Sequence, residues 1–147
     1  VQTCALPISR AYPQEVGALI LVDSTHPEQL AGAGSLDKQS LWTRGLVGAL
    51  VTGTAKEELD LLPRTGEQVL ALPTFSGKPV FVLSASEPMK ETSELARFAN
   101  EKRVAIAGMY PGSRQIWVDS GHAIPLEKPE AVVDAIRSAL VEARGAR

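Results

Sequence analysis

The chain has 147 residues, of which 44% are hydrophobic and 22% charged, a composition typical of one globular domain with a buried core rather than of a disordered segment. Acidic and basic residues are mixed along the chain and sum to a net charge of −2, so there is no basic block to bind the phosphates of a nucleic acid. No apolar run approaches the roughly 20 residues needed to span a bilayer, and the one cysteine, Cys4, excludes an internal disulfide and a cysteine-based metal cluster.

The first residues, VQTCALPI, match a translated DNA sequence better than any protein motif. Read codon by codon as GTT CAG ACG TGT GCT CTT CCG ATC, they reproduce a common sequencing-library adapter whose last base would begin the codon of Ser9. We therefore interpret residues 1–9 as translated adapter and expect the native frame to start at Ser9 or Arg10. On this interpretation the native protein extends further upstream.

Three apolar runs are typical of buried strands. Ala18–Val22 (ALILV) is continuous and rich in branched residues, as in a strand buried on both faces of a parallel sheet. The other two runs are Pro79–Leu83 (PVFVL) and Gln115–Val118 (QIWV). Each run is closed by small or polar residues. We expect three strands.

Helical patterns lie between and after these runs. The first follows Pro88, and its predicted apolar face consists of Leu95, Phe98 and Ala99. The second follows Pro129, which suits a first helical turn, and its predicted apolar face consists of Val132, Val133, Ile136 and Leu140. The alternation of strands and helices predicts an α/β fold with a parallel sheet and flanking helices.

Residues 28–76 form a connection too long to lack structure of its own. We expect short helices there: one over Leu36–Val51, one opened by a capping box of Thr54 and Glu57, and one that ends before Pro73. A helical lid over a pocket and an additional packing layer are both compatible with this pattern.

The sequence Asp119-Ser120-Gly121-His122 follows the third predicted strand, at a place where α/β enzymes present side chains to a ligand. A histidine held on such a loop can act as a general base at neutral pH. His122 is therefore the first candidate for a catalytic residue.

Three segments together resemble the C-terminal part of the α/β-hydrolase family. The segment SGHAIPLEKPEAVVDAIRSAL looks like the closing motif, with the catalytic histidine at His122 and an amphipathic final helix. AYPQEVGALILVDSTHPEQ is similar to the segment that leads into the sixth strand, and KPVFVLSASEP to the seventh strand. The resemblance covers nearly all of residues 10–147 and implies the C-terminal half of the hydrolase sheet, with residues 28–76 as a helical lid.

The family's mechanism requires a nucleophile, usually a serine in a Gly-x-Ser-x-Gly elbow, before the acid and the histidine in chain order. The sequence contains no such elbow, and neither Gly32–Ser35 nor Gly108–Ser113 has the required strand-turn-helix context. We expect the elbow shortly before Arg10 in a hydrolase of ester-like, small-molecule substrates that needs no cofactor, and an inactive chain without it. A catalytically silent, small-molecule-binding relative and a non-functional assembly artefact are the alternatives.

Asp23 and Glu87 compete for the role of the acid that orients His122. Glu87 ends the seventh strand, the family's commonest position, but Glu is less usual there than Asp and the Gly-x-x-Asp spacing is not kept. Asp23 ends the sixth strand, a position that some members use. Asp119 ranks third because we expect it to cap the histidine loop.

The other candidates have simpler roles. His26 either lines the pocket or packs its own loop, and the second interpretation is favoured. Two separated histidines lack the spacing of metal ligands, so we expect no metal site. Four large apolar side chains either line a binding cavity or pack in the core, and the second interpretation is favoured: Trp42, Phe75, Met89 and Trp117.

Overall fold

The computed structural model describes residues 2–29, 41 and 53–145. In chain order its elements are α1 (Gln2–Ala11), η1 (Pro13–Glu15), β1 (Leu19–Val22), α3 (Thr54–Ala71), β2 (Val80–Ala85), η4 (Glu87–Lys90), α4 (Glu94–Ala105), η5 (Ile106–Met109), β3 (Arg114–Val118), α5 (Ile124–Glu127) and α6 (Pro129–Gly145).

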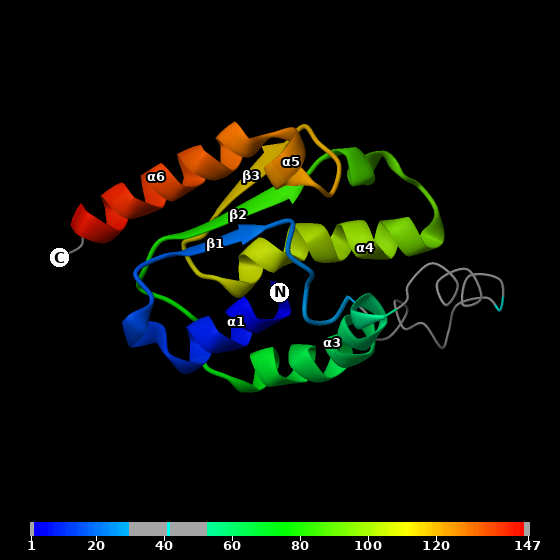
Figure 1. Cartoon of the computed structure of the whole chain (residues 1–147), viewed down its shortest axis with the longest axis horizontal. Helices are drawn as coiled ribbons and strands as arrows, with labels where there is room; N and C mark the ends of the chain where they lie inside the picture. The colour runs from blue at the N-terminus through cyan, green and yellow to red at the C-terminus, as the bar shows by residue number, and fades with distance from the viewer. Residues whose placement is uncertain (1, 30–40, 42–52, 146–147) are drawn as a thin grey trace.

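The described strands form one parallel sheet in the order β1-β2-β3 (Figure 1). Leu19–Val22 pairs in register with residues 80–83, and residues 81–85 pair with Arg114–Val118. The three predicted strands and the α/β class are thus confirmed. Burial on both faces, which the apolar run of β1 predicted, applies throughout β2, whereas in β1 alternate residues are only partly buried.

Alternate side chains of β2 enter two separate cores, because successive residues of a strand point to opposite faces. One face packs against η5 and the helices α1 and α3, and its buried residues are Leu6, Leu19, Leu21, Val69, Phe75, Val80, Val82, Ile106 and Tyr110. The other face packs against α5 and α6, and its buried residues are Phe81, Leu83, Ala85, Val118, Ile124, Ala135 and Ala139. The sheet therefore lies between two helical layers (Figure 1).

Helix α6 begins at Pro129 as predicted, but of the predicted apolar face only Val132 packs against the core. Ala135 and Ala139 are the buried residues, whereas Val133, Ile136 and Leu140 are exposed. Alanine has no bulk beyond Cβ, so this face allows the helix to lie close to β1 and β2.

The predicted apolar face of α4 is wrong at Leu95, whereas Phe98 and Ala99 are partly buried. Leu95 is exposed, and the buried residue of the helix is Asn100. Its side-chain amide donates to the carbonyl oxygen of Pro88 at 3.1 Å, which satisfies the polar group on burial.

One continuous helix, α3, replaces the two short helices expected after Gly53, and it passes through Pro63. The capping box is not formed, because Gly53 is the N-cap and its carbonyl oxygen accepts the N–H groups of Lys56 and Glu57. Since α3 packs on α1, this part of the predicted lid forms a packing layer. The helix predicted over Leu36–Val51 lies outside the described residues, apart from Leu41.

Helix α1 contains residues 2–9, whose interpretation as translated adapter stays a prediction. The side chain of Arg10 connects this helix to α3 by donating to the carbonyl oxygen of Val69 at 2.8 Å. Among the helices that the structure describes, none combines the length and apolar character needed to cross a membrane.

Candidate functional site

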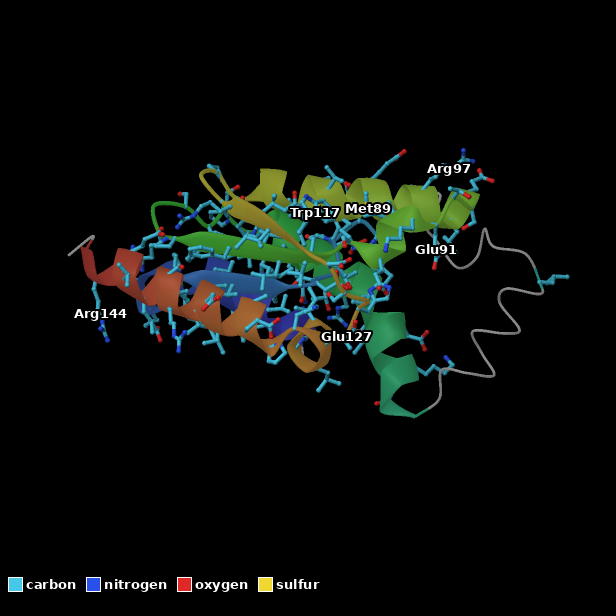
Figure 2. All side chains as sticks on the ribbon, turned by 90° about the horizontal axis from the view of Figure 1, so that it is seen from above. Met89, Glu91, Arg97, Trp117, Glu127 and Arg144 are labelled. Atoms are coloured by element: carbon cyan, nitrogen blue, oxygen red, sulfur yellow. The ribbon has the colours of Figure 1, made fainter. Side chains whose placement is uncertain are left out.

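The acidic candidates and the histidine loop meet at the carboxyl edge of the sheet, because all three strands run in the same direction. Asp23 follows β1, Glu87 follows β2 by two residues, and Asp119–His122 follows β3. Figure 2 shows Glu127, at the end of α5, on this side of the molecule and Arg144 at the opposite end. Loops at this edge are the usual place for a ligand site in parallel α/β sheets.

The shortest contact at this edge joins His122 to Asp23. Nδ1 of His122 lies 2.6 Å from Oδ2 of Asp23, across 99 residues of sequence. The side chain of Asp23 is 8% exposed and that of His122 is 71% exposed. Because an ionised carboxylate is only an acceptor, a neutral His122 must carry its proton on Nδ1. Its Nε2 then presents a lone pair and has no hydrogen-bond partner among the described residues.

The backbone of Asp23 adopts a conformation that aspartate tolerates but few other residues do. Its φ is 42°, and no other described non-glycine residue has a positive φ. The Asp23 N–H still donates to the carbonyl oxygen of Leu83 at 2.8 Å, and Oδ1 accepts the N–H of Ala85 at 3.2 Å. Backbone strain of this kind clusters at functional sites, which makes it a second, independent reason to single out Asp23.

Glu87 is near this loop but has a different set of contacts. It opens η4, its side chain is exposed, and its N–H donates to the carbonyl oxygen of Ser120 at 3.2 Å. No hydrogen bond or ion pair joins it to His122 among the described residues. Asp119 is exposed, and its Oδ1 lies 3.4 Å from Oγ of Ser86.

Glu127 restrains the histidine loop from the C-terminal side. Its Oε2 accepts the N–H of Gly121, the residue before His122, at 2.9 Å. A Cβ atom at Gly121 would lie 3.1 Å from Oε1 of Glu127, so the small residue leaves space for the carboxylate. The sequence shows a glutamate in the closing motif, but this contact depends on the turn of α5 and was not foreseen.

Arg103 on α4 also contacts Asp23, and the sequence analysis did not identify it as a candidate. Its Nε lies 3.4 Å from Oδ1 of Asp23, and its side chain is 11% exposed. A polar pair, Asn100 and Arg103, three residues apart on a predicted apolar helix is the only hint that a sequence reader would have.

His26 lies on the same loop as Asp23 but is buried, with 7% of its surface exposed. Its Nδ1 accepts the N–H of Glu28 at 3.1 Å. Burial lowers the pKa of His26, the positive charge of Lys102 lowers it further, and the Glu28 carboxylate opposes both. The Lys102 ammonium also donates to Glu28 at 2.5 Å and lowers the pKa of that carboxyl group. His26 therefore packs its own loop.

The large apolar candidates are divided between core and surface. Phe75 is a core residue, Met89 and Trp117 are partly exposed, and Trp42 lies outside the described residues. Within the part of the chain that the structure describes, no three side chains of His, Cys, Asp or Glu gather in a way that would hold a metal ion.

Comparisons with known proteins gave no match: no family model, curated protein or solved structure is significantly similar to this chain.

Proposed function

We propose that this chain is the C-terminal part of an α/β-hydrolase that cleaves ester-like bonds, with His122 as general base and Asp23 as the acid that orients it. The observation that carries the proposal is the 2.6 Å contact between Nδ1 of His122 and Oδ2 of Asp23. The imidazole is exposed and the carboxylate is buried, which leaves Nε2 accessible from solvent. The resemblance of the closing motif to that family supports the same assignment.

In this mechanism Nε2 of His122 takes the proton of a serine hydroxyl as that oxygen attacks the substrate carbonyl. The positive charge that develops on the imidazole is stabilised by the Asp23 carboxylate. His122 then returns the proton to the leaving group, and water releases the acyl group by the same route. None of these steps needs a cofactor.

The proposal places the nucleophile on a segment preceding Arg10, which the codon match of residues 1–8 supports. One donor of the oxyanion hole would follow that nucleophile, and the other would come from an earlier loop.

Glu87 is the less suitable acid in this arrangement. Its backbone N–H is bonded to Ser120 and its side chain is exposed, whereas the Asp23 carboxylate is buried and directed at the imidazole. A buried carboxylate is screened less by solvent, so it stabilises an adjacent imidazolium more effectively.

The test begins by determining the coding sequence upstream of Arg10 without the adapter. The complete protein is then expressed and assayed with p-nitrophenyl esters. We expect a serine elbow before Arg10 and a fall in kcat of about 10⁴-fold or more for His122→Gln. The matched control is His26→Gln, which alters a histidine outside the site and should leave kcat near that of the native protein. An upstream segment without a nucleophile would favour the silent binding relative.

A second experiment assays the purified 147-residue chain with the same esters. This chain should show no ester hydrolysis that depends on His122. Hydrolysis by the purified chain that disappears in His122→Ala would refute the assignment of the nucleophile to another segment.

A further inference from the structure

The Asp23 carboxylate is held by donors from three separate elements. Oδ1 accepts the N–H of Ala85 at 3.2 Å and lies 3.4 Å from Nε of Arg103, while Oδ2 faces Nδ1 of His122 at 2.6 Å. Two of these donors, a backbone amide and a guanidinium, never give up their protons at any pH relevant to function. Both act on Oδ1, which leaves Oδ2 directed at the imidazole.

Arg103 is itself held in place. Its Nη1 donates to Oδ1 of Asn100 at 2.8 Å, and the amide of Asn100 donates to the carbonyl oxygen of Pro88 at 3.1 Å. The Arg103 carbonyl oxygen accepts from Nε2 of Gln115 on β3 at 3.0 Å. The guanidinium is thus connected to η4 through Asn100, and the backbone of Arg103 is anchored to the sheet through Gln115.

We propose that Arg103 is a positioning residue that fixes the Asp23 carboxylate and thereby keeps His122 protonated on Nδ1 with Nε2 free to accept a proton. This inference rests on the proposed function of His122 and Asp23. Arg103 does not touch the reacting atoms. It restrains the rotation of the carboxylate through Oδ1 and compensates the charge of a carboxylate that is 8% exposed.

A second Arg–Asp pair in the same chain separates this role from that of an ordinary ion pair. Arg137 and Asp134 on α6 are also 3.4 Å apart, but both side chains are more than 70% exposed and neither contacts a histidine. Exposed pairs of this kind contribute little to stability. Arg137→Met is therefore the matched control for Arg103→Met.

The experiment reads the ring tautomers of the two histidines by long-range ¹H–¹⁵N correlation on the ¹⁵N-labelled chain at about pH 8, above the ordinary histidine pKa of about 6.5. His26 is an internal reference, because its Nδ1 accepts a backbone N–H and its proton must lie on Nε2. In the native chain we expect His122 to show the opposite, Nδ1-protonated pattern.

In Arg103→Met we expect the ratio of Nδ1–H to Nε2–H tautomer of His122 to fall about tenfold, as for the loss of a charge-assisted hydrogen bond. Arg103→Lys keeps the charge and should recover part of that ratio, which a purely structural defect would not do. Arg103→Gln removes the charge but keeps a polar side chain, so it decides the outcome if the methionine variant does not fold. A native ratio in a folded Arg103→Met variant, or in Arg103→Gln where the methionine variant does not fold, would overturn the role of Arg103. Mainly Nε2–H at His122 in the native chain would instead overturn the proposed function.

Discussion

The two histidines of the chain are close in the fold but have opposite environments. His122 is exposed, and its Nδ1 faces a carboxylate, so its neutral ring is protonated on Nδ1. His26 is buried, and its Nδ1 accepts a backbone N–H, so its neutral ring is protonated on Nε2. The partner of Nδ1 therefore decides which ring nitrogen is available for chemistry.

Both environments depend on one short loop after β1. Asp23, at its start, reaches His122, and His26, three residues later, closes the loop on itself through the N–H groups of Glu28 and Gln29. The loop after β1 thus holds the carboxylate that contacts His122 and also buries His26. Changes on the His122 side should alter chemistry, and changes on the His26 side should alter stability.

The largest effect should come from the acid. In the complete protein, Asp23→Asn should lower kcat by about 10⁴-fold, because an amide can donate to Nδ1 and favour the wrong tautomer. Glu87→Gln should leave kcat near the native value. Steady-state kinetics on a p-nitrophenyl ester measures both, and a larger loss for the Glu87 variant would reverse the assignment of the acid.

The next effect concerns the contact between the His26 loop and α3. A Cβ atom at Gly66 would lie 2.2 Å from the carbonyl oxygen of Pro27, a backbone atom with little freedom to move. Gly66→Ala should therefore lower the free energy of unfolding by about 1–3 kcal/mol, although alanine is the better helix former by about 1 kcal/mol.

Urea denaturation measures this change, with Gly108→Ala as the control because a Cβ at that position would meet no atom within 4 Å beyond its own neighbouring backbone. A stabilised Gly66→Ala variant would mean that the loop does not rest on α3.

The strands were predictable because each is a short apolar run closed by polar or small residues, a local signal. The packed faces of α4 and α6 were not, because side-chain size and hydrogen bonding decided them. Ala135 and Ala139 are buried in place of larger residues, and Asn100 is buried because Pro88 offers it an acceptor.

At the site, the sequence identified His122 and offered both Asp23 and Glu87 as its acid, but it left the choice between them open. In the structure the Asp23 carboxylate, and not that of Glu87, contacts the His122 ring on the loop after β3. Arg103 is 80 residues from Asp23 in sequence and reaches it only because α4 packs beneath the strands. Such contacts follow from tertiary structure, which no local pattern encodes.

A smaller effect should appear in how the free energy of unfolding depends on pH. Because burial lowers the pKa of His26 below its ordinary value of 6.5, the unfolded chain binds a proton near that pH that the folded chain does not. The free energy of unfolding should thus be at its full value above pH 6.5 and fall as the pH drops toward the lowered pKa of the folded state.

His26→Gln should remove this contribution, and His122→Gln should retain it. Urea denaturation across this pH range measures the difference. An unchanged pH dependence in His26→Gln would show that other groups cause it.

The smallest effect should come from Lys102, whose charge lowers the pKa of His26 from outside the buried loop. Lys102→Met should raise that pKa, because a nearby positive charge is removed and the Glu28 carboxylate is no longer neutralised. The pKa should stay below its ordinary value, because burial, the larger cause, remains. The free energy of unfolding at neutral pH should change little, as for other exposed ion pairs.

An NMR titration of the His26 ring measures the pKa directly. Lys56→Met is the control, since it breaks the exposed pair with Asp60 on α3 and should leave the His26 titration unchanged. If Lys102→Met also left it unchanged, the low pKa of His26 would be a property of burial alone, and the loop could be altered at its surface without affecting the histidine that packs it.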